Sequence, residues 1–296
     1  MNNSTTKLVN NYSVKKDNKA LKKYQLKSGT VSIIIGLIVL LPFVFFALFP
    51  FLFATHDPIA ISVLNRLSPP FGKYLLGTDE LGRDIFSRIV YGSRISMFAA
   101  VATISIATGV GTFIGVIAGY KGGWIDEFLM RLVDLTMSFP ALLLAIAIAA
   151  AAGPGIVNST IAIAAVWWPQ YARLTRGVVI SIKKQPFVDA AIVIGGSNSH
   201  IMRAHLLPNL VTPVLIRMTI DLGYAILFLA SLGFLGLGEP PPHPEWGSML
   251  FEGRYYILSY WWPAVFPGIA LTLVTLGVTF LGDGLTDRLD PRLRRS

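Results

Sequence analysis

Two ionisable residues, Arg217 and Asp221, stand four positions apart in an otherwise apolar run from Leu210 to Gly238. Four positions are about one helical turn, so the two side chains can form an ion pair. An unpaired charge near the middle of a membrane costs about 2.5 to 3.5 kcal/mol, and ionisable residues there are functional candidates by default. We interpret the pair either as structural or as candidate translocation-path residues. In a proton-coupled carrier, Asp221 would be the group that titrates.

Other residue types that perform chemistry are scarce. The chain has no cysteine, which excludes disulfides, thiolate catalysis and cysteine-ligated metal sites. His200 and His205 are separated by five positions, which places them on different helical faces, and none of the four histidines has zinc-site spacing. The Gly-x4-Gly-Lys-Ser/Thr loop that cradles nucleotide phosphates is absent, and residues 71–74, Phe-Gly-Lys-Tyr, do not replace it. We therefore predict no catalytic residue, metal site or cofactor on this chain.

The composition predicts an all-α, polytopic membrane protein. Of the 296 residues, 53% are hydrophobic and 14% are charged, whereas soluble domains average about 25% charged residues. One crossing needs about 20 apolar residues, so the chain has room for six transmembrane helices. We predict them at residues 31–54, 95–120, the two halves of 135–172 on either side of Gly153-Pro154-Gly155, about 210–238 and about 262–282.

These spans divide the chain into five parts. We predict a cytoplasmic tail at 1–30, a first transmembrane helix at 31–54, an external segment at 55–94, a five-helix core at 95–283 and a cytoplasmic tail at 284–296. This orientation agrees with the positive-inside rule, because only six of the 25 lysines and arginines then lie outside. They are Arg66, Lys73, Arg83, Arg88, Arg94 and Arg254.

Small residues recur at every fourth position of the second predicted span. Ala107, Gly111, Gly115 and Gly119 therefore share one helical face. Stripes of this kind let two helices approach closely. We predict that the three glycines serve helix packing, and the alternative is that they line a pore.

A polar stretch at 183–209 separates two predicted spans on the cytoplasmic side. Pro186 and Asp189 favour a helix start, Gly195 allows the backbone to turn, and Pro208 disfavours helix at the residue before it. We predict two short helices at an angle. Several side chains here are too apolar for a free loop, which indicates a partner surface. They are Phe187, Val188, Ala190, Ala191, Ile192, Val193, Ile194, Ile201 and Met202.

The order Asp-Ala-Ala, three residues, Gly, and then an apolar pair before proline resembles the coupling loop of ABC importer permeases, which usually opens with Glu. The resemblance implies that an ATP-binding subunit receives the loop in a groove and moves the spans through it. The residues to which it assigns this coupling role are Phe187, Asp189, Ala190, Ala191, Gly195, Leu207 and Pro208.

Further segments resemble the dipeptide, oligopeptide and nickel permeases of that family. The external sequence 76–94, LGTDELGRDIFSRIVYGSR, resembles the signature before the second span, although its arginines and acids also suit a folded cap without substrate contact. The likeness continues at 119–134, at Phe139-Pro140-Ala141 and at 281–293, where Thr286 replaces a common Arg. It thus covers about residue 76 to the end.

The chain therefore resembles the shorter, C-type permease subunit, and the resemblance implies the type I ABC importer fold in a bacterial inner membrane. It also implies a second homologous permease, two ATP-binding subunits that hold ATP and magnesium, an extracytoplasmic substrate-binding protein and contact with lipid, but no nucleic acid. The implied cargo is short peptides, with nickel or a metal chelate as the alternative. The chief rival is an ion-coupled secondary transporter, and an intramembrane hydrolase is a weaker one.

Overall fold

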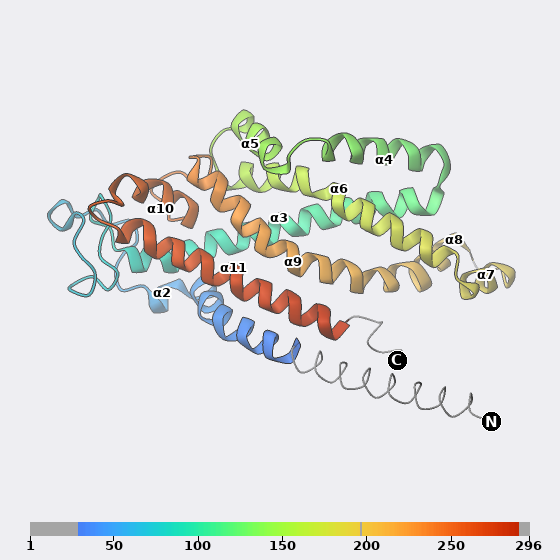
Figure 1. Cartoon of the computed structure of the whole chain (residues 1–296), viewed down its shortest axis with the longest axis horizontal. Coiled ribbons are helices and arrows are strands. Elements are labelled where there is room, and N and C mark those ends of the chain that lie inside the picture. The colour runs from blue at the N-terminus through green and yellow to red at the C-terminus, as the bar shows by residue number, and fades with distance from the viewer. Residues whose placement is uncertain (1–28, 196, 290–296) are drawn as a thin grey trace, which may run out of the picture.

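The computed structural model of the chain describes residues 29–195 and 197–289, and the structure there is helical, with one isolated β-bridge between Thr78 and Asp84. Residues 1–28 of the predicted N-terminal tail and 290–296 of the predicted C-terminal tail lie outside these residues, as does Gly196 in the predicted coupling loop. The first part of the predicted C-terminal tail, 284–289, continues helix α11. The helices are Gly29–Leu48, α2 (Pro50–Phe53), α3 (Ile85–Lys121), α4 (Gly123–Met137), α5 (Ala141–Ala152), α6 (Ile156–Lys183), α7 (Pro186–Val193), α8 (Asn198–Ile201), α9 (Leu207–Phe234), α10 (Trp246–Gly253) and α11 (Trp262–Leu289) (Figure 1).

Four stretches of helix are long and apolar enough to cross a membrane: Gly29–Leu48, Ile85–Lys121, Met202–Phe234 and Trp262–Arg288. The pair α4 and α5, bent by 88°, makes five if it counts as one span. The 28-residue α6 occupies the fourth predicted span, but Asn158, Gln170 and Arg173 make it more polar than the others.

Several helix ends differ from the predicted boundaries. The first helix stops at Leu48, since Pro50 starts the separate turn α2. Helix α3 begins at Ile85, well before the predicted residue 95, because Asp84 caps it by accepting a hydrogen bond from the Ser87 N–H at 3.0 Å. Its 37 residues span about 55 Å at ~1.5 Å per residue, so its first turns belong to the predicted external segment.

The third predicted span is broken. Helix α4 ends at Met137 and α5 begins at Ala141, after Pro140. Proline disfavours helical backbone in the residue before it, here Phe139, so the chain bends instead of continuing straight. The predicted turn between the third and fourth spans is present, with Gly153 and Gly155 at φ values of 88° and 145°.

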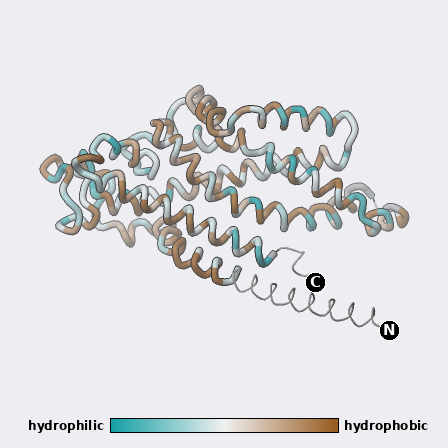
Figure 2. Tube along the Cα trace, viewed as in Figure 1, coloured by the Kyte–Doolittle hydropathy of each residue, from teal (hydrophilic) through white to brown (hydrophobic). Residues whose placement is uncertain are grey.

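Helices α3, α6 and α9 form the centre of the bundle, and α3 packs most extensively against α6. The N-terminal helix and α11 lie together on one side, while α4 and α5 cover the other (Figure 1). The central contacts are made by buried apolar side chains such as Ile104, Ile163, Tyr171, Leu229 and Val274. Brown, hydrophobic stretches run along the length of these helices (Figure 2).

Candidate functional site

The predicted coupling loop folds as two short helices at one end of the bundle, the end opposite α10 (Figure 1). Helix α7 spans Pro186–Val193 and α8 spans Asn198–Ile201. Between them, Gly195 adopts a φ of 85°, a left-handed conformation that glycine reaches without strain. A Cβ there would meet no atom within 4 Å, so backbone conformation, not space, favours glycine.

One face of the loop is covered by the chain itself. Val188, Ala191 and Ile201 are buried and pack together with the partly buried Ile182 of α6. These residues need no outside partner, contrary to the inference from their apolar character. Ala191 therefore stabilises the loop, and in this arrangement its side chain does not reach the loop surface.

The opposite face remains uncovered. Phe187, Asp189 and Ala190 are exposed, and the side chains of Val193 and Ile194 are 85% and 84% exposed. Phe187, Ala190 and Ile194 have the i, i+3, i+7 spacing of one helical face. We call the apolar members of this surface, Phe187, Ala190, Val193 and Ile194, the outer face of the loop.

Helix α9 starts directly after the loop. Leu207, predicted to be non-helical because Pro208 follows it, is the first residue of α9 and has helical φ and ψ values. Proline is tolerated in the first turn of a helix, and the wider π-helical turn Met202–Leu206 precedes it. Both Leu207 and Pro208 are exposed, and the helical path from Met202 to Phe234 is continuous.

Polar contacts tie the end of α6, which leads into the loop, to α3 and α4. The Lys183 Nζ donates to the Tyr120 carbonyl of α3 at 2.7 Å. The Arg176 guanidinium donates to both carboxylate oxygens of Asp126 on α4, one at 2.7 Å, and α6 pairs with α4 again further along the helix. A force on α7 would therefore reach α3, α4 and α6 together.

Arg217 and Asp221 form the predicted ion pair, with the Arg217 Nε 2.8 Å from the Asp221 Oδ2. The Asp221 side chain is 1% exposed and the Arg217 side chain is 40% exposed. Arg217 also donates to the Gln170 side chain of α6, a contact that sequence spacing did not indicate. The buried Tyr171 hydroxyl of α6 lies against the Asp221 carboxylate and against Thr108 of α3. The pair thus belongs to a larger polar group inside the bundle.

The glycine stripe of α3 faces α6. A Cβ on Gly111 would lie 2.3 Å from the Trp168 carbonyl oxygen, and one on Gly115 would lie 2.4 Å from that of Ala172. Gly119 is nearly as close to α6. These distances place the stripe at a helix–helix contact and leave no room for a pathway along it.

The predicted external segment contains a buried group of charges. Arg83 pairs with Asp79 at 2.6 Å, and Arg83 and Arg88 each donate to the Glu252 carboxylate of α10 at 2.9 Å. Burial raises the pKa of the Glu80 carboxyl, and the Asp79 carboxylate raises it further. Carboxylate oxygens of Asp79, Glu80 and Glu252 lie within 4.8 Å of one another. Arg83 and Arg88 supply the positive charge that offsets the repulsion between these acids.

Helix α10 is held by its N-terminal cap. The Glu245 carboxylate accepts hydrogen bonds from the Gly247 and Ser248 N–H groups, both at 2.8 Å, and from the Ser96 hydroxyl of α3. Glu245 is buried, and burial raises the pKa of its carboxyl. This cap and the Glu252 contacts both fasten α10 to the start of α3.

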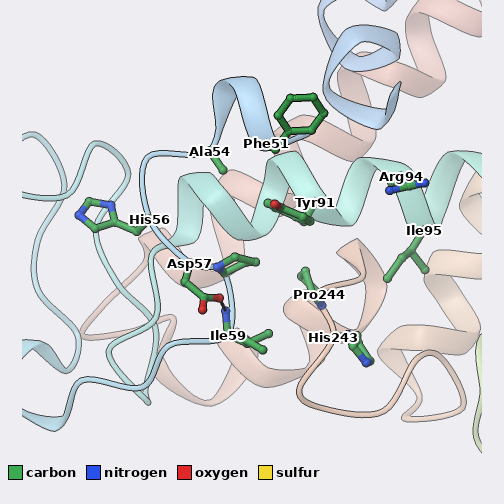
Figure 3. Close-up of a pocket in the computed structure, with 11 residues that line it drawn as sticks. Phe51, Ala54, His56, Asp57, Ile59, Tyr91, Arg94, Ile95, His243 and Pro244 are labelled. Carbon is green, nitrogen blue, oxygen red and sulfur yellow. Dashed lines mark hydrogen bonds between the residues drawn. The ribbon is translucent and has the colours of Figure 1, made fainter. Parts of the chain in front are cut away.

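A cavity of about 610 Å³ opens at this same end of the molecule. Figure 3 shows it between α3, which contributes Tyr91 and Arg94, the segment after α2, which contributes Asp57, and the loop that carries His243. Because its walls come from three separate segments, a movement of any one of them against α3 would change its shape.

Residues 111–295 match the family described as "binding-protein-dependent transport system inner membrane component". The chain is 44% identical to the dipeptide transport system permease protein DppC of Alkalihalophilus pseudofirmus, over 91% of this chain and 88% of the relative. It is 40% identical to the probable D,D-dipeptide transport system permease protein DdpC of Escherichia coli, over 91% and 90%, and 40% identical to the di/tripeptide permease DppC of Pseudomonas aeruginosa, over 88% of each.

Solved structures also include chains with a similar fold. One of them is a chain of the MetNI methionine ABC transporter, from a crystal form described as inward facing. The TM-score is 0.50 at 16% sequence identity, and the match covers 65% of this chain and 93% of the other.

Proposed function

Because the chain belongs to the family of binding-protein-dependent transport system inner membrane components, we propose that it forms one half of the membrane pathway of an ATP-driven importer of short peptides. It is a multi-pass protein of the bacterial inner membrane. The observation that carries the proposal is the 44% identity to a dipeptide permease over 91% of the chain. The relatives named above are peptide permeases, which supports peptides over nickel or a metal chelate as the cargo. Membership of a binding-protein-dependent transport family supports neither an ion-coupled carrier nor a hydrolase.

The proposed topology has six crossings with both termini in the cytoplasm. A Cβ on Gly29 would lie 2.7 Å from that of Asp287, so the first and last described helices meet at one end of the bundle. Two ends on the same side require an even number of crossings, which supports α6 as a span beside the bent pair α4–α5. The excess of lysine and arginine at that end supports its cytoplasmic location.

The proposed partners are a second homologous permease, two ATP-binding subunits that carry ATP and magnesium, and an extracytoplasmic substrate-binding protein. The outer face of the loop supports an attached subunit, since three of its side chains are large, apolar and exposed. When the ATP-binding subunits close, they would push on α7. The contacts of Lys183 and Arg176 then carry that displacement into α3 and α4.

Reconstitution tests the proposal directly. We expect the chain, co-expressed with its permease and ATP-binding partners, to import a labelled dipeptide into proteoliposomes only when ATP and the binding protein are both supplied. Vesicles with an imposed ion gradient and no ATP are the control. Peptide uptake driven by that gradient would contradict the ATP-driven mechanism, and uptake of nickel but no peptide would contradict the cargo.

We propose that Arg217 and Asp221 border the translocation path. A guanidinium that is 40% exposed is unfavourable against lipid, by about 2.5 to 3.5 kcal/mol if it lies near mid-membrane. Its exposed part therefore faces water or the second permease. The polar side chains of Gln170 and Tyr171 nearby support the same orientation.

Removing the carboxylate separates a structural role from a transport role. We expect Asp221→Leu to lower the thermal stability of the purified complex and to reduce peptide uptake at least about tenfold, because the Arg217 charge loses its partner. The double variant Arg217→Met/Asp221→Leu should recover stability but not uptake. Asp283→Asn, an exposed acid of α11, is the matched control. Recovery of both properties in the double variant would assign the pair a purely structural role.

A further inference from the structure

The segment between α2 and α3, residues 54–84, forms a cap that extends past the start of α3 (Figure 1). It exposes large apolar side chains on two separate turns. Leu64, on the 3-10 turn Val63–Asn65, is 99% exposed, and Phe71 is 78% exposed. Val63 is also exposed. Exposing large apolar side chains to water does not stabilise a loop, and exposed apolar surface marks sites of interaction.

The base of the cap is rigid. The Ser62 and Leu67 N–H groups donate to the Leu81 and Asp79 carbonyls, both at 3.0 Å. Gly82 fits because it has no side chain, since a Cβ there would lie 1.9 Å from the Ser62 carbonyl oxygen. Its neighbours are fixed further by the buried pairs of Arg83 with Asp79 and Glu252. The exposed turns are therefore preorganised, which reduces the entropy lost when a partner binds.

Phe71 is also held in an unfavourable backbone conformation. Its φ is 66°, a left-handed value that costs a residue with a bulky side chain about 1 kcal/mol or more. Burial does not offset this cost, because the ring is largely exposed. Gly72, which could take such a value freely, is the next residue. Strain of this kind is typical of functional sites.

Positive charge accompanies the apolar turns. Arg66 and Lys73 are exposed and form no ion pair within the part of the chain that the structure describes. The acids of the cap are mostly engaged elsewhere, since Asp79 and Glu80 pair with Arg83 and Asp84 caps α3. A complementary partner would present an apolar hollow with carboxylates at its edge.

We propose that Val63, Leu64 and Phe71 anchor the extracytoplasmic binding protein on this permease, with Arg66 and Lys73 contacting acidic side chains around the anchor. The inference rests on the proposed function and on its orientation, which puts the cap outside the cell. The binding protein then contacts the cap, and the predicted five-helix core forms the pathway for the peptide.

Lipid is a poorer occupant of this surface. The aromatic residues at 255–262 lead into α11 and are typical of a membrane interface. Trp262, the first residue of α11, donates to the Thr78 carbonyl at the base of the cap. The exposed turns extend from this base away from the uncharged part of α3. Lipid tails also adapt their shape, so insertion would gain nothing from a strained and fixed Phe71.

Titration of the complex with its binding protein tests the anchor. In nanodiscs containing both permeases and the ATP-binding subunits, we expect Leu64→Ser and Phe71→Gly each to raise the half-saturating concentration of binding protein for ATPase stimulation about tenfold or more. Basal and maximal rates should stay the same. Phe71→Gly relieves the backbone strain, so strain in the variant does not account for weaker binding. Leu258→Ser, in an equally exposed position outside the cap, should leave the titration unchanged.

The outcomes separate this inference from the proposed function. If the unmodified complex responds to the binding protein and both cap variants titrate as it does, the anchor is wrong and the function stands. If both cap variants instead change only their retention in the nanodisc, the cap contacts lipid and the anchor is again wrong. If the unmodified complex shows no response to the binding protein, the proposed function itself fails.

Discussion

Replacing Gly115 with valine is expected to remove most of the folded protein from the membrane, whereas the same replacement at Gly109 is expected to leave it folded. A Cβ on Gly115 would lie 2.4 Å from the Ala172 carbonyl oxygen and 2.8 Å from the Thr175 Cβ. The first of these atoms belongs to the backbone of α6, and the second is bonded directly to it. They cannot move without shifting α6. A Cβ on Gly109, on the same helix, would meet nothing within 4 Å.

The expected loss for Gly115→Val is about 3 kcal/mol or more, at the upper end of overpacking costs. The amount of protein in membranes and its thermal unfolding in detergent measure it, with Gly109→Val as the matched control. Gly115→Ala should fall between the two. Equal stability of the two valine variants would mean that the close approach of α3 and α6 does not hold the bundle together.

In the glycine stripe, the sequence predicts the packing face but not the helix that packs against it. The four-residue spacing of Gly111, Gly115 and Gly119 predicts a shared face, because that periodicity is a property of one helix. It cannot identify the helix on the other side. That α6 fills this place depends on tertiary packing, which brings Trp168 and Ala172 to the stripe.

For the charged residues too, spacing predicts contacts within one helix but not contacts between helices. The pair of Arg217 with Asp221 was predictable because both lie on one helical turn, and their ion pair is present at 2.8 Å. Gln170 is on another helix, so nothing in local spacing connects it with Arg217. Likewise, Glu252 pairs with Arg83 and Arg88, which are more than 160 positions away in the sequence. The available signal of the contact with Arg217 was Gln170 itself, a polar side chain in a predicted span.

In the coupling loop, local signals predicted the two helices and the turn at Gly195, but they could not separate its two faces. Val188 and Val193 are the same residue type on one short helix. One is buried against Ile201 and the other is 85% exposed. Only the position of α8 and α6 decides which side is covered. In the third predicted span, Pro140 indicated a break. The span was predicted as continuous because the residues around Pro140 are uncharged and mostly apolar.

Exchange of Ile194 for aspartate is expected to abolish coupling without affecting membrane insertion. Ile194 is 84% exposed on the outer face of the loop, so the folded chain loses little. A carboxylate there would have to be buried, unpaired, in the groove of an ATP-binding subunit. Loss of a central apolar contact at an interface typically costs at least about 2 kcal/mol, or roughly 30-fold in affinity. We therefore expect the ATP-binding subunits to fail to co-purify and peptide uptake to fall to the background.

Two further variants make this result specific to the outer face. Ser181→Asp places the same charge at an exposed position of α6 just before the loop and should leave subunit binding and uptake intact. Val188→Asp, on the buried face, should instead destabilise the loop itself, which limited proteolysis of the membrane-inserted chain would detect. If Ile194→Asp retains its ATP-binding subunits and normal uptake, the outer face is not where they attach. Cleavage of Ile194→Asp as fast as Val188→Asp would mean that the variant had lost its fold rather than its partner.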